Sequence, residues 1–415
     1  MFLTKPKNYL NGPPQKSAKP PQQQTDSPMS LQKIKVKFGS NLVVGTLNMR
    51  RSTKLALKFP TDDRSVKIGL LPLDDIQGKG AQRVSTMIRH SKALAKLNVK
   101  FSGIIAKYSK KLFTSFREKR TMKKLVLDFN DASGFNTRCS ESLLAGLRNL
   151  SSLSFLQIIF WQGITNQSLI NFSLGLRKMY SLSVMILNLN KGCYTDSFAA
   201  NVFFCCLKRL RSLSVLQLDF GSKLVNVDLQ SLGEALSQLA PLTSLTLNFD
   251  YNFQITSKAL ESLASGLLIR RCTRNAKILK TLELSFMNCR GMCDKGLSAL
   301  GGYLSKSFEI VNLKLNFSRC KKITNKGVEA LAKGIVGLPL MSLDLRFDAC
   351  QHIKNSGLEK LADIIKDLSS DCFISLDFTD CQKISEEMKK SFRLSLKGKN
   401  TACLDGKRVI FSGAT

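Results

Sequence analysis

The sequence predicts an α/β solenoid, in which short strands alternate with helices in stacked repeats. The first observation is a motif that recurs about every thirty residues: Leu282-Glu-Leu284-Ser-Phe286-Met-Asn-Cys289 returns in phase at Leu313, Leu343 and Ile374. The second is that a stretch of helical period follows each motif. One unit cannot bury both its strand face and its helix stripe. Neighbouring units must therefore stack and share one core.

An apolar triplet of period two predicts each strand, because alternate side chains face the same side of a sheet. It occurs at Leu97/Val99/Phe101, Leu125/Leu127/Phe129, Leu156/Ile158/Phe160, Met185/Leu187/Leu189, Leu216/Leu218/Phe220, Leu245/Leu247/Phe249, Leu282/Leu284/Phe286, Leu313/Leu315/Phe317, Leu343/Leu345/Phe347 and Ile374/Leu376/Phe378. The phenylalanines are in phase with this core. We therefore interpret them as a buried spine and not as a ladder for stacking nucleic-acid bases.

Apolar residues at i, i+3, i+4 and i+7 predict the helix of each unit. Val328, Leu331, Ala332 and Ile335 show this spacing. The same stripe recurs at Leu229/Leu232/Leu236, Leu260/Leu263/Ala264/Leu267 and Leu358/Leu361/Ala362/Ile365. Each helix is thus expected to bury one face against the strands.

A cysteine occupies the turn after the strand in four units, at Cys289, Cys320, Cys350 and Cys381. With the Leu-x-Leu cores, this pattern resembles the leucine-rich repeat family, in its long ribonuclease-inhibitor-like class, over residues 94–390. The resemblance implies a horseshoe with a parallel concave sheet and outer helices. Two extra residues between strand core and cysteine depart from the usual pattern. They resemble a variant common in protist proteins and leave the curvature open.

Four segments follow from these patterns. Residues 1–30 are rich in Pro and Gln and contain four lysines, so they predict a disordered basic tail. Residues 31–93 hold strand-like triplets at irregular spacing, which indicates degenerate repeats or an N-terminal cap. The array follows over 94–390. Residues 391–415 are expected to form a C-terminal cap and tail.

The chain carries 63 Lys and Arg against 30 Asp and Glu, a formal net charge of +33. Residues 1–124 contain 27 of these bases and only 6 of the acids. Such an excess predicts an acidic partner, because Lys and Arg are attracted to nucleic acid, acidic protein tails and anionic membranes alike. Charge alone leaves these partner classes open.

The exposed strand positions are expected on the concave surface, where they are predominantly acidic. The candidate concave-surface residues are Asp128, Asp219, Glu283, Lys314, Asp344, Arg346 and Asp377. Five acids and two bases would not hold phosphates. We therefore expect a polyanion to contact the amino-terminal end or the loops of the array.

Two clusters of bases are candidate polyanion-binding sites. The first, on an expected outer helix and its exit loop, contains Lys107, Lys110, Lys111, Arg117, Lys119, Arg120, Lys123 and Lys124. The second lies in the one stretched repeat and contains Arg270, Arg271 and Arg274. Insertions in repeat arrays often form binding loops. The alternatives are a solvated helix face and a tolerated loop extension.

The residues give little support for catalysis or cofactor binding. His90 and His352 are the two histidines, and neither has a fixed nucleophile beside it in the sequence. The twelve cysteines form no CxxC pair, so we expect reduced thiols and neither zinc nor any other cofactor. We expect no small-molecule substrate. No run of about twenty apolar residues predicts a transmembrane segment.

These observations favour a non-enzymatic scaffold for protein–protein interaction that docks on an acidic partner. The alternative is an RNA-binding component of a ribonucleoprotein particle, such as an organellar ribosome. Weaker alternatives are a ubiquitin-ligase substrate adaptor and a cytoskeletal or membrane adaptor. We expect an intracellular location, cytoplasmic before mitochondrial, because no signal peptide stands at the start.

Overall fold

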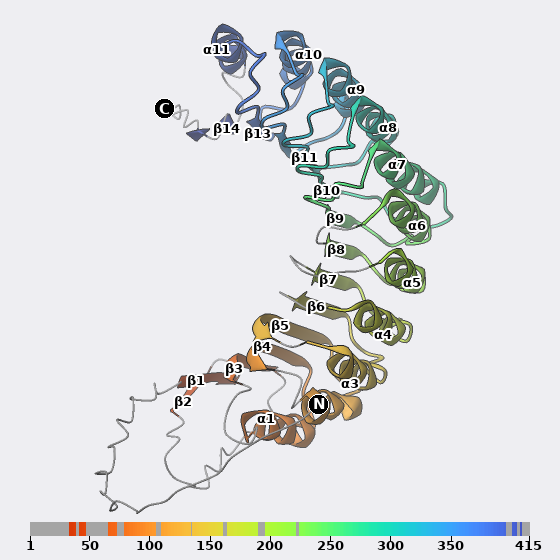
Figure 1. Ribbon diagram of the computed structural model, residues 1–415, viewed down its shortest axis with the longest axis vertical. Coiled ribbons are helices and arrows are strands. Elements are labelled where there is room, and N and C mark those ends of the chain that lie inside the picture. Colours follow the sequence, from red (N-terminus) through yellow and green to blue (C-terminus); the bar gives the residue numbers. More distant parts are fainter. Residues whose placement is uncertain are drawn as a thin grey trace, which may run out of the picture.

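The structure is a computed structural model that describes residues 33–38, 41–46, 65–72, 79–104, 109–133, 135–160, 164–189, 196–220, 224–395, 401–404 and 407–408. The predicted tail over residues 1–30 lies outside the described residues, as does part of the predicted N-terminal cap over residues 31–93. The described elements build a curved solenoid, with strands along the inside and helices along the outside (Figure 1). The α/β repeat architecture predicted from the sequence is confirmed.

One sheet runs through the whole array, in the order β15-β14-β13-β12-β11-β10-β9-β8-β7-β6-β5-β4-β3-β1-β2. Strands β3 to β14 pair in parallel with their neighbours, whereas β1, β2 and β15 are antiparallel additions at the ends. The strands are β1 (Lys33–Phe38), β2 (Asn41–Thr46), β3 (Ser65–Pro72), β4 (Lys96–Ile104), β5 (Lys124–Ser133), β6 (Phe155–Phe160), β7 (Val184–Leu189), β8 (Val215–Phe220), β9 (Ser244–Asn248), β10 (Thr281–Ser285), β11 (Asn312–Asn316), β12 (Ser342–Arg346), β13 (Phe373–Asp377), β14 (Thr401–Leu404) and β15 (Lys407–Arg408).

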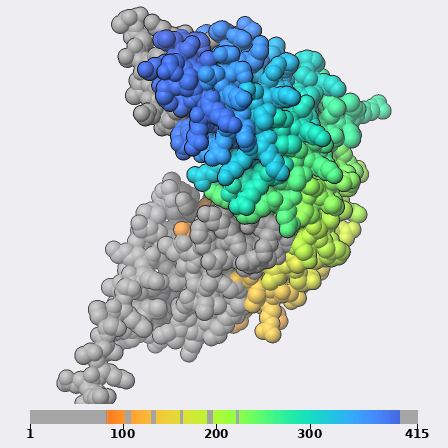
Figure 2. Space-filling model, turned by 45° about the horizontal axis from the view of Figure 1, so that its top comes forward, coloured from red at the N-terminus to blue at the C-terminus, as the bar shows by residue number. Residues whose placement is uncertain are grey.

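A helix follows strands β3 to β13 and returns the chain along the convex side, as parallel pairing of successive strands requires. The helices are α1 (Lys79–His90), α2 (Ser109–Thr114) with the 3-10 turn η2 (Ser115–Glu118), α3 (Thr137–Leu147), α4 (Asn166–Leu176), α5 (Ser197–Leu207), α6 (Asn226–Ser237), α7 (Ser257–Arg271), α8 (Asp294–Leu304), α9 (Asn325–Ile335), α10 (Asn355–Lys366) and α11 (Glu386–Ser395). The repeats follow one another in sequence order through the body of the molecule (Figure 2).

The core is the continuous layer between sheet and helices. The ten predicted apolar triplets are all buried in it. Their phenylalanines form the expected spine, with ring centroids 4.6 Å apart between Phe101 and Phe129 and 5.9 Å apart between Phe286 and Phe317. Leu189 takes the ring's place in β7 and interrupts the stack. The buried rings are therefore unavailable for base stacking.

The turn cysteines tie each repeat to the one before it. The thiol of Cys320 donates to the carbonyl of Phe286 at 3.2 Å, and Cys350 and Cys381 repeat the bond one and two units later. The preceding residue adopts a left-handed conformation in each turn, with φ of 62° at Arg319 and 54° at Ala349. We call these bonds the thiol ladder. They explain why a small, buried donor recurs at this position.

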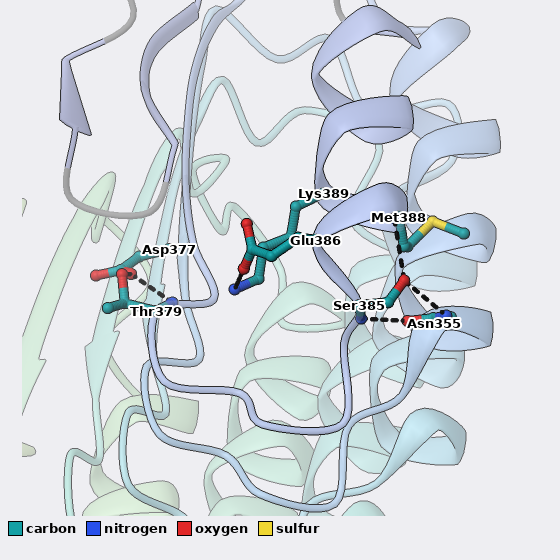
Figure 3. A network of polar contacts seen from close by, with 7 residues as sticks. All are labelled: Asn355, Asp377, Thr379, Ser385, Glu386, Met388 and Lys389. Carbon is teal, nitrogen blue, oxygen red and sulfur yellow. Dashed lines mark hydrogen bonds and ion pairs between the residues drawn. The ribbon is translucent and has the colours of Figure 1, made fainter.

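A second ladder links the amino-terminal ends of the helices. The side-chain oxygen of Asn355 accepts from the backbone N–H of Ser385 at 2.9 Å, as the close-up of the last repeat shows (Figure 3). Asn325 accepts from Lys354 in the same way at 2.7 Å, and Asp294 accepts from Thr324 at 2.7 Å. These bonds satisfy N–H groups that the start of a helix leaves unpaired.

Candidate interaction surface

The seven concave-surface candidates alternate with buried leucines on the strands, on the inner side of the arc. Asp128 is in β5, Asp219 in β8 and Glu283 in β10. Lys314 is in β11, Asp344 and Arg346 in β12, and Asp377 in β13. The alternation places side chains that the chain separates by about thirty residues next to each other on one surface.

The two concave bases are held by one acid. Arg346 donates to both carboxylate oxygens of Asp344 at 3.0 and 2.9 Å, and the Nζ of Lys314 lies 3.7 Å from the same carboxylate. This group lines a depression of about 320 Å³ together with Glu283 and Ser375. Because the bases are already paired, this part of the concave surface offers a bound anion little uncompensated positive charge.

Asp219 and Asp250 lie close together near the middle of the concave surface. Burial, and then the charge of Asp250, raises the pKa of Asp219 above its ordinary value. Burial also raises the pKa of Asp250, which accepts hydrogen bonds from Ser285 Oγ at 2.6 Å and from the Met287 N–H at 2.8 Å. Asp250 is the second residue after the end of β9 and was not among the sequence candidates. The pair makes the concave surface unfavourable for phosphates.

The edge where helices lead back into strands forms a continuous ledge along the array. Backbone hydrogen bonds join the entry residue of each strand to its predecessor, for example Ser183 to Ser154 at 2.9 Å and Met341 to Val311 at 2.8 Å. Since all these strands are parallel, every helix-to-strand loop opens on this one rim. Residues on it therefore face a partner together despite their distance in sequence.

The first half of this rim is lined by exposed bases, which we call the basic rim. One of them lies in η2 itself, two follow the end of each of η2, α4 and α5, and one follows α3. The basic rim consists of Arg117, Arg120, Lys123, Arg148, Arg177, Lys178, Arg209 and Arg211. None of the eight pairs with an acid within the described part of the chain. Their charges are consequently open to an external anion.

Lys119 does not belong to this surface, although the sequence placed it in the first basic cluster. Its side chain is turned inward, and the residue is 5% exposed. The ammonium group donates to the carbonyls of Arg89 and Ser91, both at 2.9 Å, and burial lowers its pKa. This candidate is corrected: Lys119 ties α1 to the turn after η2 and is closed to an external phosphate.

Arg270 is the second correction. It ends the apolar stripe of α7 and is 2% exposed. The guanidinium donates to the carbonyls of Leu239 at 2.9 Å, Ala240 at 3.2 Å and Lys277 at 2.6 Å, and also to that of Leu242. Its donors are occupied by the inserted loop and the neighbouring repeat. Arg270 therefore stabilises the stretched repeat from within.

The remaining cluster residues lie at the surface. Lys107 is outside the described residues. Lys110 and Lys111 are exposed on α2, and Arg274 is exposed in the inserted loop. Two bases cover aromatic rings: Lys124 lies 4.1 Å from the ring centroid of Phe155, and Arg271 lies 5.1 Å from that of Phe308. The bases that the structure brings together are thus those near the helix ends.

Sequence reasoning missed Arg148, Arg177, Lys178, Arg209 and Arg211. These bases form no local run, because each repeat contributes only one to three. Superposing the repeats by their predicted helix ends would have revealed them, since each stands within four residues after the helical stripe. The useful signal was the position of each base within its repeat, which the number of charges in a short stretch of sequence does not show.

The described residues hold no group of three or more His, Cys, Asp and Glu side chains that could ligate a metal. The Nδ1 of His90 donates to the carbonyl of Thr86 at 2.7 Å, and the Nδ1 of His352 lies 3.3 Å from the Nζ of Lys383. Both histidines are exposed. No helix in the described ranges is long and apolar enough to cross a membrane.

The comparison with protein-family models agrees with the repeat geometry. A family model described as "Leucine Rich repeat" matches residues 312–332, which include β11 and the beginning of α9. No curated protein sequence matches the chain. Among 95 matching chains of solved structures is one from the crystal structure of the Rad7 and Elc1 complex in yeast. It is 17% identical, covers 74% of this chain and 68% of its own, and has a TM-score of 0.46. The fold is a leucine-rich repeat solenoid.

Proposed function

We propose that this chain is a non-enzymatic interaction scaffold, of the ribonuclease-inhibitor-like class of leucine-rich repeats, that docks through its basic rim on an acidic protein partner. The observation that carries the proposal is the alignment of eight exposed, unpaired bases on one ledge across four successive loops. An interaction scaffold needs a rigid surface and no moving catalytic groups. The shared core and the two ladders supply that rigidity.

Electrostatics favours the rim over the concave surface as the docking site. Exposed bases at the ends of successive helices add their fields along the ledge, which steers and orients an acidic partner. The concave surface, in contrast, carries Asp219, Asp250 and the neutralised group around Asp344. An acidic partner on the rim would avoid these carboxylates.

The thiols support a reducing, intracellular compartment for this scaffold. Ten cysteines in the described ranges are present as thiols outside disulfides. Cys205 and Cys206 are adjacent in α5, one exposed and one buried, and the four turn cysteines are occupied as donors to carbonyls. Free thiols at this density are typical of proteins from reducing compartments.

The test is binding of a labelled poly-glutamate peptide across a salt series. The rim variant carries Arg117→Gln, Arg148→Gln, Arg177→Gln and Arg209→Gln, one base from each of four loops. If each exposed pair contributes roughly 0.3 to 0.5 kcal/mol, the four changes lower affinity by about tenfold. A control with the same loss of charge carries Lys321→Gln, Lys322→Gln, Lys326→Gln and Lys354→Gln, which are exposed on the opposite rim.

Selective weakening by the rim variant, with a flatter salt dependence, supports the proposal. Equal weakening by both variants would mean that net charge alone attracts the peptide, and the rim would have no special role. A labelled single-stranded RNA of equal charge is measured in parallel. If RNA binds more tightly than the peptide at physiological salt and its salt slope falls in the rim variant, the ribonucleoprotein alternative replaces the protein partner.

A further inference from the structure

The second half of the same rim carries large exposed apolar side chains among its charged residues. Within the described part of the chain, large hydrophobic side chains are exposed at 13 positions. Four of these lie in the three consecutive helix-to-strand loops after α7, α8 and α9, and a fifth is the first residue of β13, just after the loop that follows α10. We call them the apolar rim: Ile278, Phe308, Val336, Met341 and Phe373. Phe308 and Met341 are 63% and 68% exposed. Clustering of this kind on one ledge marks an interaction site, whereas scattered apolar residues do not.

Two hollows interrupt the apolar rim. The first, of about 200 Å³, lies between the loops after α7 and α8. Its lining includes Ile278, Leu279, Tyr303 and Phe308 together with the charged residues Arg271, Lys277 and Glu309. The second, of about 460 Å³, lies between the loops after α9 and α10 and is lined by Val336, Met341, Ile364 and Leu368. Backbone bonds from Val311 to Lys280 and from Met341 to Val311 hold these loops at fixed distances. Each hollow suits a large apolar side chain.

Opposite charges border the two ends of the apolar rim. Arg271, Arg274 and Lys277 are exposed beside the first hollow, where they outnumber the one acid of its lining, Glu309, and Arg271 also covers the face of Phe308. Asp367 and Asp371 are exposed beside the second. Among the described residues none of these five forms an ion pair. The charges therefore give the surface a direction, which a plain apolar patch lacks.

We propose that the apolar rim docks an amphipathic protein segment whose apolar side chains enter the two hollows. Its acidic end lies over Arg271, Arg274 and Lys277, and its basic end lies over Asp367 and Asp371. This partner surface is separate from the basic rim and does not depend on the acidic partner proposed above. The charged ends favour one orientation of the segment on the apolar rim, whereas a purely apolar segment would bind equally well in either orientation.

The geometry sets the length of the segment. The hollows are two repeats apart, and repeats are spaced about 5 Å at the sheet and 8 to 10 Å at the helices, so the hollows are separated by roughly 10 to 20 Å. A helix rising 1.5 Å per residue spans this distance with about 7 to 13 residues. Successive helices α7 to α10 run side by side along this part of the arc (Figure 1), so one straight segment can reach both hollows.

The test uses two labelled synthetic helices with the same apolar face. One carries acidic residues at one end and lysines at the other, and the second carries lysines at both ends. Fluorescence anisotropy with the full chain at physiological salt should show that the first peptide binds at least about tenfold more tightly. Arg271→Glu with Arg274→Glu should abolish or reverse this preference. Lys321→Glu with Lys322→Glu on the opposite rim is the matched control.

Phe308→Ser with Met341→Ser should weaken binding of the first peptide by at least about tenfold. These two side chains line the hollows, and contacts between such pockets and the anchor side chains of a partner contribute most of the binding energy. Phe198→Ser with Leu394→Ser, equally exposed on other surfaces, should leave it unchanged. Equal binding of both peptides, or an unaffected Phe308→Ser/Met341→Ser variant, overturns the proposal. A dimer of the free chain that the same variant dissociates would also overturn it, because a second copy would then occupy the rim.

Discussion

Replacing Arg270 by Met tests whether the inserted repeat is held from within. The guanidinium supplies donors to four carbonyls, of which those of Leu239 and Leu242 are in buried bonds. An unpaired buried acceptor costs about 1 to 3 kcal/mol, so the two buried carbonyls together cost roughly 2 to 6 kcal/mol. Water can replace the donors at the partly buried carbonyls of Ala240 and Lys277.

The loss is partly offset, because Arg270→Met also removes a charge that is costly to bury. Burial lowers the pKa of Arg270, which reflects that cost, while Met keeps the length of the apolar stem. The expected net effect is a decrease of about 2 to 4 kcal/mol in the free energy of unfolding. Urea denaturation followed by circular dichroism measures it.

Arg271→Met is the matched control, since Arg271 is exposed and contacts only the face of Phe308 among the interactions described above. It should lower the free energy of unfolding by less than about 1 kcal/mol. Arg270→Met should also leave the affinity for poly-glutamate unchanged. A variant that unfolds within about 1 kcal/mol of the wild type and binds the peptide less well would refute the structural role.

Three further predictions concern single sites. Burial raises the pKa of the thiol of Cys320 to about 12, so this thiol should not react with maleimide at pH 8 until the chain unfolds. The exposed Cys205 and Cys272 should be labelled in the same brief treatment, and mass-spectrometric mapping distinguishes the sites. Ala349→Gly should raise the free energy of unfolding by about 0.5 to 1 kcal/mol in urea titrations, because glycine tolerates its positive φ. Asp219→Asn should raise the free energy of unfolding at pH 7 by up to about 1 kcal/mol but should not raise it at pH 3. The raised pKa means that the carboxylate of Asp219 destabilises the folded state, and this carboxylate forms only above the ordinary carboxyl pKa range. Equal effects at both pH values would contradict this.

The repeat period predicted the fold because it reports packing directly. Each Leu-x-Leu-x-Phe triplet must face the core, and each does. Lys119 and Arg270 were predicted to lie at the surface and bind an anion. That prediction was wrong because it weighed their charge above their position in the apolar stripe of a helix. Lys119 continues the stripe of Leu112 and Phe116, and Arg270 continues that of Leu263 and Leu267. Both bases are in phase with an apolar stripe, and both turn inward to donate to backbone carbonyls.

The basic rim could not be predicted from any single stretch of the sequence. Arg148 and Arg177 are neighbours on the ledge only because α3 and α4 end at the same height. The pairing of Lys314 with Asp344 likewise depends on the register of β11 and β12, which places these residues opposite each other. The fold follows from periodicity along the chain, whereas the surface follows from adjacency between repeats.

The thiol ladder also determines how the array would respond to mechanical load. Each turn thiol donates to a carbonyl of the preceding unit, as Cys381 does to Phe347 and Cys350 does to Phe317. Tension applied at the carboxyl end would therefore load one unit at a time and would not shear the whole sheet. Each released unit of about thirty residues would lengthen the chain by about 100 Å. The array would then lengthen in steps, because the unit at the carboxyl end unfolds first while the preceding repeats stay folded.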